Sequence, residues 1–300
     1  MNTKKITLFV IVLALVLLIV GLSGCDKGFG PTVIEVTTPP YETITFQNGD
    51  VTLAGTLDLP AGEGPFPAMV TIHGSPPLTR NDIYNLNISH FFVQHGYAVL
   101  RYDKRGAGES GGEYTGVGTE DGEAQVNVLA EDALAAVEFL KNHELIDSNM
   151  IGLIGHSQAG WIIPHAASKS TDVAFMIISS GPTSTVGHEI YYSDLINEEG
   201  FSVQEANDKV GDYTGPVGYD PIPALQQLDI PGLWLLGAQD NSIPIPLTIE
   251  ILDALIADQG KDFSYIVDQY RGHAWKDEET GQIYPVLFNA LNWLDEKFVD

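Results

Sequence analysis

The sequence predicts an α/β fold in which a mostly parallel central sheet carries helices on both faces. Short apolar runs alternate with longer segments of helical periodicity, and these runs lie at 68–72, 98–102, 151–154 and 173–179. A continuous apolar run of this length suits a strand buried on both faces, and strands that alternate with helices form parallel sheets. About 260 residues follow position 40, which is enough for one domain with a sizeable core.

A leading β-hairpin is expected ahead of the parallel strands. Residues 41–46 and 51–59 are rich in Thr, Ile, Val and Leu, and the segment Gln47-Asn48-Gly49-Asp50 joins them. The dipeptide Asn-Gly is the strongest short-range hairpin signal, because both residues tolerate a positive φ. The pattern therefore predicts two antiparallel strands at the start of the fold.

Helices are expected between the central strands. The pattern predicts them over 83–95, 120–142 and about 161–168. In the longest of these, apolar side chains recur on one face, at Val126, Leu129, Leu134, Val137 and Leu140. A stripe on one face indicates packing against the sheet.

The alternation of strands and helices lapses between about 181 and 228. This segment is rich in Tyr, Glu and Asp and contains short helical patches. Because it precedes a further apolar strand, the one that leads to Asp240, we expect it to form a small helical cap that lies over Ser157. Its tyrosines either line a substrate pocket or pack the cap on itself, and they are Tyr191, Tyr192, Tyr213 and Tyr219.

Residues 1–24 have the features of a secretory signal peptide. Two lysines precede an unbroken apolar run over 6–22, and small residues then lead to Cys25. This ending resembles a bacterial lipobox, so we expect cleavage before Cys25, lipid attachment to it, and a tether over 25–40. The alternative is an uncleaved anchoring helix, since about 17 apolar residues is near the minimum that spans a bilayer. Either outcome predicts an extracytoplasmic protein held at the cell membrane.

The chain is strongly acidic. Asp and Glu number 40 against 14 Lys and Arg, so the net charge is −26, and it becomes −28 if Lys4 and Lys5 leave with the signal peptide. This charge repels nucleic acid and favours solubility, so no nucleic-acid partner is expected. Cys25 is the only cysteine, which excludes an internal disulfide.

A candidate nucleophile lies in the segment IGLIGHSQAG at 151–160. An apolar run ends there in a tight turn around Ser157, and a helical pattern follows. Such a strand, turn and helix expose a serine hydroxyl on a strained backbone, with small neighbours that let the helix pass close to the strand. Gly155 fits this pattern, but Ala159 occupies the position of the second glycine and Gly160 comes one step later. The alternative is an ordinary serine in a glycine-rich turn.

Two further side chains complete a possible catalytic set. The pattern of 230–244 predicts a buried strand followed by a loop that carries Asp240. The pattern of 263–275 predicts a strand followed by a loop that carries His273. Ser157, Asp240 and His273 each follow the carboxyl end of an expected strand, where open α/β sheets place their sites. A serine needs a histidine to accept its proton and a carboxylate to orient that histidine. Taken singly, Asp240 could cap a turn and His273 could be a surface histidine.

Acyl transfer also requires backbone amides that stabilise an oxyanion. Gln158 follows the candidate nucleophile and would supply one N–H, and the loop after the strand at 66–72 would supply the other. In His73-Gly74-Ser75-Pro76-Pro77 the prolines lack an N–H, so Ser75 is the expected donor. We expect His73 to brace this loop rather than to transfer protons.

Five segments together resemble the α/β-hydrolases of the esterase, thioesterase and serine-aminopeptidase-like group. They are HGSPP at 73–77, YDKRGAGESGGEY at 102–114, IGLIGHSQAGW at 151–161, GAQDNSIP at 237–244 and GHAW at 272–275. The resemblance implies an α/β-hydrolase fold with Ser157 as nucleophile, Asp240 as acid and His273 as base. Pro164 departs from the pattern, because it removes a hydrogen bond to Gly160 early in the helix.

Two other expectations concern the surroundings of this set. The glycines and charges of 102–110 suit a sharp turn beneath the site, with anion binding by Arg105 as the alternative. The histidines show no paired ligand spacing and no phosphate-binding glycine loop with lysine is present, so neither a metal nor a cofactor is expected.

The sequence therefore predicts a serine hydrolase that cleaves a small ester or related acyl bond through an acyl-enzyme. One alternative is a serine aminopeptidase-like peptide hydrolase, in which a cap carboxylate binds the free amino terminus; the candidates are Glu189, Glu198 and Glu199. The other alternative is a non-catalytic surface lipoprotein on the same scaffold.

Overall fold

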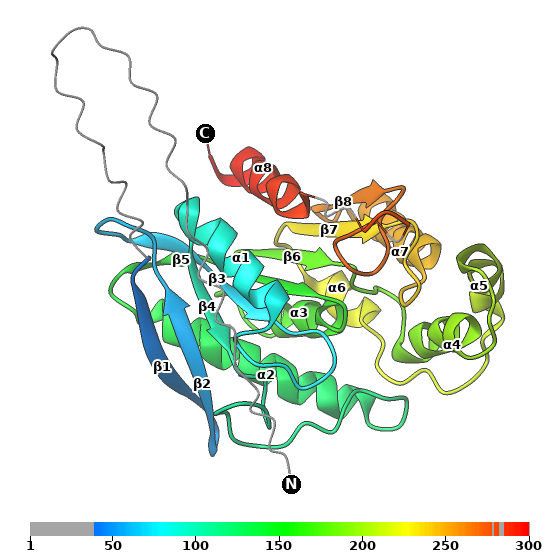
Figure 1. Ribbon diagram of the computed structural model, residues 1–300, viewed down its shortest axis with the longest axis horizontal. Helices are drawn as coiled ribbons and strands as arrows, with labels where there is room; N and C mark the ends of the chain where they lie inside the picture. The colour runs from blue at the N-terminus through cyan, green and yellow to red at the C-terminus, as the bar shows by residue number, and fades with distance from the viewer. Residues whose placement is uncertain (1–38, 278, 282–284, 300) are drawn as a thin grey trace, which may run out of the picture. The chain divides into compact units, whose positions relative to one another are not determined.

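The computed structural model describes residues 39–277, 279–281 and 285–299, and an eight-stranded sheet forms the centre of this part (Figure 1). The strands follow the order β1-β2-β4-β3-β5-β6-β7-β8. The hairpin strands β1 and β2 and the pair β2 and β4 are antiparallel, and the other neighbours are parallel. This confirms the predicted mostly parallel sheet with a leading hairpin. The predicted signal peptide, Cys25 and nearly all of the tether lie outside the described residues.

The strands occupy the segments that the apolar runs indicate, although β5 begins five residues earlier than expected and β2 and β6 are slightly shorter than expected. They are β1 Tyr41–Asn48, β2 Val51–Asp58, β3 Phe66–Ile72, β4 Ala98–Tyr102, β5 Ile146–His156, β6 Phe175–Ser179, β7 Gly232–Gly237 and β8 Phe263–Asp268. The parallel register aligns their carboxyl ends: Ile72 pairs with Gly155, His156 with Ser179, and Gly237 with Asp268. The loops that carry the candidate residues therefore all leave the sheet at the carboxyl ends of its parallel strands.

Helices cover both faces of the sheet (Figure 1). One face packs on α1 and α8 through side chains such as Phe92 and Trp293, and the other packs on α2, α3, α6 and α7. The helices are α1 Ile83–Gln94, α2 Gly122–Lys141, α3 Ala159–Ser168, α4 Val186–Asn197, α5 Val203–Lys209, α6 Ile222–Gln227, α7 Ile245–Gln259 and α8 Val286–Phe298, with a 3-10 turn η1 at Val210–Asp212. Four of the five apolar residues predicted on the face of α2 are buried, and Leu134 is half-buried.

The structure differs from the sequence-based expectation in three details. The hairpin turn is formed by Gly49 and Asp50 rather than by Asn48 and Gly49, because Asn48 pairs with Val51; Gly49 has the required positive φ of 57°. Helices α7 and α8 were not among the expected elements. The helix α3 begins at Ala159, before the expected start at about 161, and it ends at Ser168 as expected.

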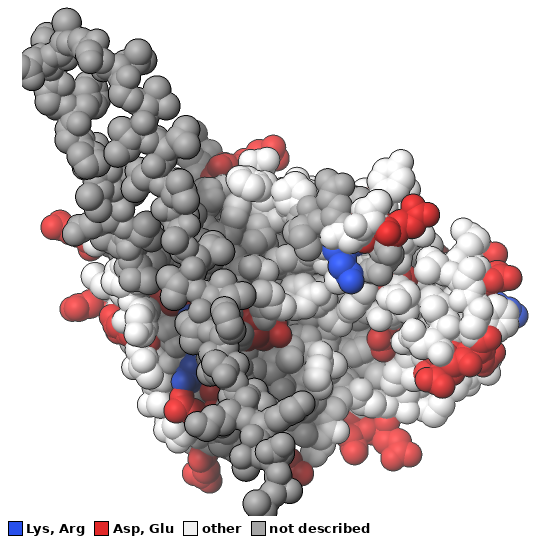
Figure 2. All heavy atoms as spheres, viewed as in Figure 1, with Lys and Arg blue, Asp and Glu red and all other residues white. Residues whose placement is uncertain are grey.

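The segment 181–228 contains α4, α5, η1 and α6. Tyr192, Leu195, Ala206 and Val210 form a small apolar cluster of their own within it. In the space-filling view, acidic side chains far outnumber basic ones on the visible face (Figure 2), in keeping with the composition. Among the described residues, no helix combines the length and the apolar character needed to cross a bilayer.

Candidate active site

Ser157 lies on a sharp turn between β5 and α3 and has a φ of 59°. Positive φ is rare for a residue with a side chain and costs free energy, so the surrounding structure must hold it. The Ser157 N–H donates to the Ser179 carbonyl at the end of β6 (3.0 Å), and the Gly160 N–H donates to the Ser157 carbonyl (2.8 Å). This strained turn lifts the hydroxyl away from the sheet edge.

The packing around this turn explains why Ala159 is tolerated in place of glycine. A Cβ added to Gly155 would lie 2.5 Å from the Ala159 Cβ and 2.6 Å from the Ile72 carbonyl oxygen, so Gly155 leaves the room that the Ala159 methyl group fills. The close helix approach falls instead on Gly160, where a Cβ would meet the Pro182 nitrogen at 2.6 Å. The small residues are therefore required at 155 and 160.

Asp240 follows β7 and is completely buried. Its Oδ1 accepts hydrogen bonds from the N–H groups of Ser242 and Ile243, both at 2.8 Å. The hydroxyl of Tyr192 donates to the Asp240 backbone carbonyl at 2.7 Å. These bonds fix the carboxylate in one orientation below the rim of the sheet.

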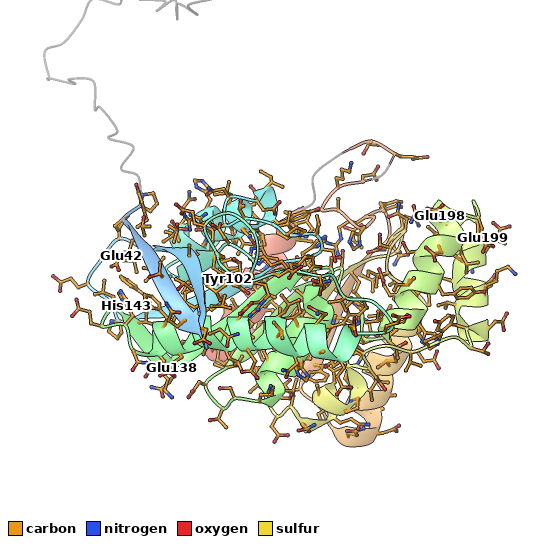
Figure 3. The ribbon with its side chains drawn as sticks, turned by 90° about the horizontal axis from the view of Figure 1, so that it is seen from below. Glu42, Tyr102, Glu138, His143, Glu198 and Glu199 are labelled. Atoms are coloured by element: carbon orange, nitrogen blue, oxygen red, sulfur yellow. The ribbon has the colours of Figure 1, made fainter. Side chains whose placement is uncertain are left out.

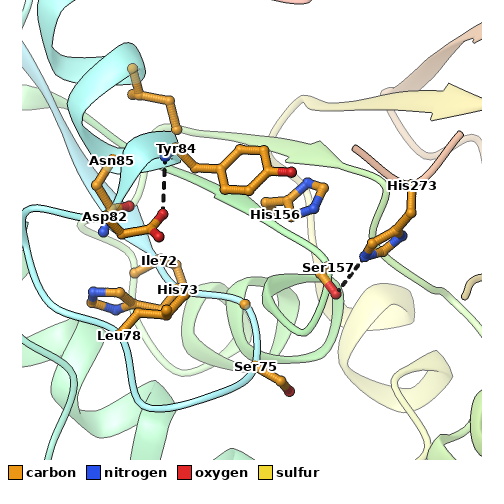
Figure 4. Close-up of a pocket in the computed structure, with 12 residues that line it drawn as sticks. Ile72, His73, Ser75, Leu78, Asp82, Tyr84, Asn85, His156, Ser157 and His273 are labelled. Atoms are coloured by element: carbon orange, nitrogen blue, oxygen red, sulfur yellow. Dashed lines mark hydrogen bonds between the residues drawn. The ribbon is translucent and has the colours of Figure 1, made fainter. Parts of the chain in front are cut away.

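His273 joins Asp240 to Ser157. Its Nδ1 lies 3.0 Å from each carboxylate oxygen of Asp240. Its Nε2 lies 3.0 Å from the Ser157 Oγ, and Figure 4 shows this second contact. Loops that follow β5, β7 and β8 thus bring together three residues that are far apart in the sequence. A carboxylate that accepts from Nδ1 keeps Nε2 available as a base toward the serine hydroxyl.

The loop after β3 passes directly beside Ser157. A Cβ on Gly74 would lie 3.2 Å from the Ser157 Cβ and 3.1 Å from the His156 carbonyl oxygen, so a larger residue would require these neighbours to move by a few tenths of an ångström. The residue that follows, Ser75, is joined to Pro76 by a cis peptide bond. Ser75 and Gln158 also touch through their side chains, because the Gln158 Nε2 donates to the Ser75 Oγ at 2.9 Å.

A cavity of about 240 Å³ opens beside Ser157 on the side of α1 (Figure 4). Residues of the loop after β3, the first turns of α1 and the candidate set line it: Ile72, His73, Gly74, Ser75, Leu78, Asp82, Tyr84, Asn85, Ile88, His156, Ser157 and His273. The Tyr84 ring stacks on His156, with 4.4 Å between ring centroids. The centroid of the His156 ring lies 4.8 Å from that of His273.

Two histidines next to the site are held neutral. Burial, with His273 and Arg271 nearby, holds the pKa of His156 well below its ordinary value. Burial and the charge of Lys104 lower the pKa of His73 to about 3, and its ring packs edge-on against Tyr102. His73 is 3% exposed.

The tyrosines of the cap do not line this cavity. Tyr192 is buried against Asp240, the Tyr219 hydroxyl lies 3.1 Å from the His165 Nδ1, and Tyr191 stacks on Tyr213. The expectation that these tyrosines line a substrate pocket is therefore wrong for the cavity beside Ser157. Their contacts fit the alternative, in which they pack the cap on itself and on its neighbours. The physical reason is that α1 rather than the cap supplies the wall on that side.

The turn after β4 has the structural role that its glycines and charges suggest. Arg105 forms a buried ion pair with Asp132 through two hydrogen bonds, at 2.6 and 2.7 Å. Its guanidinium group is therefore engaged in a structural contact rather than in binding a substrate anion. The Asp103 carboxylate accepts from the N–H groups of Arg80 and Glu109, both at 2.8 Å. Gly108 lies so close to Asp103 that a Cβ would be 2.3 Å from its Oδ2.

The three cap glutamates lie in different surroundings. Glu198 and Glu199 are exposed just beyond the carboxyl end of α4, away from the sheet (Figure 3). Glu189, in the first turn of α4, is half-buried and electrostatically coupled to both His273 and Asp240. Burial raises the pKa of Glu189 from 4.5 to about 7, His273 opposes this rise, and the charges of Asp240 and Asp194 add to it.

Glu189→Gln is expected to remove a pH-dependent loss of stability. Because the pKa of Glu189 is raised in the folded state, the wild type loses folding free energy as the pH rises from about 4.5 through 7. The glutamine variant lacks this loss, so relative to wild type it should gain roughly 1 to 3 kcal/mol over that range. Urea unfolding of both proteins at pH 4.5 and pH 7.5 measures the change. Glu199→Gln is the exposed control and should show no such gain; an equal gain in both variants would contradict the assignment.

One buried residue at the site was not anticipated. Lys104 is 1% exposed, and its Nζ donates to the Gly74 carbonyl and to the Gln158 side chain. In the sequence it is a lysine just after a strand, where a solvated position is the usual expectation. Its partner Gln158 is 54 residues further on, so no local spacing connects them.

No cluster of His, Cys, Asp and Glu able to hold a metal ion occurs in the described part of the chain. The arrangement that the structure does contain is a hydroxyl, an imidazole and a buried carboxylate in series, beside a small cavity. Such a series can transfer a proton from the hydroxyl to the imidazole and expose an oxygen nucleophile.

A comparison with known protein families identifies the family to which the chain belongs. The model of the prolyl oligopeptidase family matches residues 84–300, which is most of the chain and includes Ser157, Asp240 and His273. The chain belongs to the prolyl oligopeptidase family. This membership confirms the resemblance to the α/β-hydrolases found in the sequence.

Individual relatives of this prolyl oligopeptidase family member include esterases and peptidases. Esterase EstD of Thermotoga maritima is 32% identical over 148 residues, which cover 46% of this chain and 34% of the esterase. Acylamino-acid-releasing enzyme 1 of Oryza sativa subsp. japonica is 25% identical over 194 residues, covering 60% of this chain and 24% of that enzyme. The chain thus spans about a third or less of the length of these two relatives.

Solved structures share the fold at low sequence identity. The Pyrococcus furiosus esterase Pf2001 superposes with a TM-score of 0.64 at 18% identity, covering 87% of this chain and 94% of the esterase. The Pyrococcus horikoshii acylaminoacyl peptidase superposes with a TM-score of 0.63 at 19% identity, covering 87% of this chain and 42% of the peptidase. These matches confirm the α/β-hydrolase fold.

Proposed function

We propose that the protein hydrolyses carboxylic esters of small acids through an acyl-enzyme on Ser157. The observation that carries this proposal is the hydrogen-bonded series from Asp240 through His273 to Ser157, with 3.0 Å at each step and Ser157 on a strained turn. The similarity to an esterase over part of the chain supports it.

In the first half of the reaction, His273 accepts the Ser157 proton at Nε2 while the Oγ attacks the ester carbonyl. The N–H groups of Gln158 and Ser75 donate to the oxyanion that forms. His273 then gives its proton to the leaving alcohol, and the acyl group stays on Ser157. In the second half, His273 takes a proton from water, which attacks the acyl-enzyme and releases the acid. Asp240 keeps the imidazole in one tautomer throughout.

The cavity beside Ser157 favours a short acyl group. Its volume of about 240 Å³ lies below the roughly 300 to 1,000 Å³ that is typical of pockets for drug-sized ligands. Leu78 and Ile88 make part of its wall apolar, and the stacked rings of Tyr84 and His156 bound it on another side. We propose that this cavity receives the acyl chain, with the alcohol directed toward solvent.

Tyr84→Ala is expected to shift the preferred acyl chain to greater length, because it removes one wall of the cavity. Each added CH₂ that becomes buried contributes about 0.8 kcal/mol, or roughly a fourfold gain in kcat/KM. Nitrophenyl esters from acetate to decanoate, hydrolysed by wild type and variant, measure the shift. Tyr41→Ala, on the exposed edge strand, is the control. An unchanged optimum in Tyr84→Ala would show that the acyl chain binds elsewhere.

Peptide hydrolysis at a free amino terminus is the second candidate function. Glu189 favours it, because a half-buried carboxylate coupled to His273 and Asp240 could bind a substrate ammonium group. The name of one relative agrees with this candidate: dipeptidyl peptidase 8 of Mus musculus, which is 23% identical over 290 residues that cover 90% of this chain and 31% of that enzyme.

A substrate panel separates the two candidates. Short nitrophenyl esters and aminoacyl nitroanilides are compared at equal enzyme concentration, with and without an acetylated amino group. The esterase proposal expects kcat/KM for the esters to exceed that for every nitroanilide by orders of magnitude, with little effect of Glu189→Gln on esters. A preference for free-amine nitroanilides that disappears in Glu189→Gln would favour the peptidase instead.

A further inference from the structure

A buried lysine lies beneath the two chain segments that flank Ser157. Lys104 follows β4, and its Nζ donates to the Gly74 carbonyl oxygen at 2.8 Å and to the Gln158 Oε1 at 2.7 Å. The same ammonium group lies 3.9 Å from the centroid of the Tyr114 ring, within cation–π distance. Two oxygens and a ring face thus surround the Nζ.

The partners of Lys104 are themselves connected. The Gln158 Nε2 donates to the Ser75 Oγ at 2.9 Å and to the Tyr114 hydroxyl at 3.0 Å. Lys104 holds the loop after β3 through Gly74, and it holds the start of α3 through Gln158. These are the segments whose N–H groups, at Ser75 and Gln158, are proposed to bind the oxyanion.

The burial of the Lys104 ammonium group lowers the stability of the folded protein. Within the described residues, no carboxylate lies within ion-pair distance of Lys104, so no opposite charge offsets its burial. Burial lowers the pKa of Lys104 to about 7, which reports the same cost. An apolar side chain of similar length would avoid it. Stability alone therefore gives no reason for a lysine at this position.

We propose that Lys104 is a positioning residue for acyl transfer, which fixes the spacing of the Ser75 and Gln158 amides by holding the Gly74 carbonyl and the Gln158 side chain. The inference rests on the proposed acyl transfer at Ser157 and adds a residue that lies outside the series Ser157, His273 and Asp240. Amides that must meet an oxyanion at about 2.7 to 3.1 Å lose most of their effect when they shift by about 1 Å.

The test is Lys104→Met, assayed with a short nitrophenyl ester. We expect kcat to fall by about 100-fold with KM changed by less than about threefold, because the oxyanion is present in the transition state and not in the bound ester. An alkylboronic acid, which adds to Ser157 and mimics the tetrahedral state, should bind more weakly by a similar factor. The corresponding carboxylic acid product should bind as it does to wild type.

Lys261→Met is the matched control. Lys261 also donates from its Nζ to a backbone carbonyl, that of Leu228 at 2.8 Å, and its side chain is largely buried. It precedes β8 and so lies at the amino ends of the parallel strands, whereas Ser157 lies at their carboxyl ends. Its replacement should leave kcat and boronate binding unchanged.

Gln158→Leu tests the same connection from the other side, since it removes the side-chain contacts and keeps the backbone amide. We expect a loss of kcat in this variant, and in the double variant a loss smaller than the product of the single effects. Should Lys104→Met fail to fold, full kcat in Gln158→Leu would overturn the inference.

If wild type cleaves esters and Lys104→Met keeps its kcat and boronate affinity, the inference fails while the proposed function stands. If wild type neither cleaves esters nor binds the boronate, the proposed function fails.

Discussion

Replacing Ser157 with alanine is expected to lower kcat for ester hydrolysis by roughly 10⁴ to 10⁶-fold. The alanine variant has no oxygen for His273 to deprotonate, so only substrate binding and the oxyanion amides remain to assist attack by water. The fold should survive, because the turn is held by backbone bonds, from the Ser157 N–H to Ser179 and from the Gly160 N–H to the Ser157 carbonyl. Steady-state hydrolysis of a short nitrophenyl ester and a circular dichroism spectrum measure both parts of this prediction.

Ser170→Ala is the control for this experiment. Ser170 lies just beyond the far end of α3, and its hydroxyl accepts a hydrogen bond from the Asp172 N–H, so it resembles Ser157 in being a serine next to the same helix. Its kcat should match wild type. Turnover in Ser157→Ala within tenfold of wild type would exclude an acyl-enzyme at this residue.

Asp240→Asn is expected to lower kcat by about 10⁴-fold with little change in the fold. The Oδ1 of Asp240 accepts two loop amides, and an asparagine oxygen can keep both bonds. The amide nitrogen then takes the place of Oδ2 and faces the His273 Nδ1 with its hydrogens. This group favours the tautomer of His273 that carries its proton on Nε2, and that tautomer cannot take a proton from Ser157.

Asp268→Asn provides the matched control. Asp268 ends β8, the strand before the His273 loop, and its carboxylate also accepts a loop amide, that of Tyr270 at 3.0 Å. This variant should keep wild-type kcat and KM. If Asp240→Asn keeps more than about a tenth of the wild-type kcat while Asp268→Asn is normal, Asp240 does not orient the base.

The features that could be predicted from the sequence are those set by local geometry. Each parallel strand is a short apolar run, and its carboxyl end fixes where the next loop begins. Ser157, Asp240 and His273 each follow such an end, and the aligned register then places their loops along one edge. The requirement for Gly155 is also local, since it follows from the close approach of α3 to β5.

Two helices were missed although the sequence contains signals for them. In α7, Leu252 and Leu255 are buried on one face, and Gly260 ends the helix with a φ of 65°. In α8, the buried residues Val286, Ala290, Trp293 and Leu294 follow helical spacing. The same reasoning that identified α2 applies to both segments.

Other features depend on contacts that no local pattern encodes. The cavity lies toward α1 because Tyr84 stacks on His156, and the two residues are remote in the sequence. Lys104 is buried because Gly74 and Gln158, from two other loops, receive its hydrogen bonds. Side chains from several loops decide such surroundings together, so only the folded chain reveals them.

The central claim is that His273 and Asp240 make the Ser157 hydroxyl an acyl acceptor, and covalent labelling tests it most directly. The wild-type protein, Ser157→Ala and Asp240→Asn are treated with a fluorophosphonate, and the modified peptide is located by mass spectrometry. The predicted result is one adduct per chain on Ser157 in wild type, no adduct in Ser157→Ala, and labelling of Asp240→Asn slowed by orders of magnitude. An unlabelled wild type, or an adduct on another residue, would contradict the account.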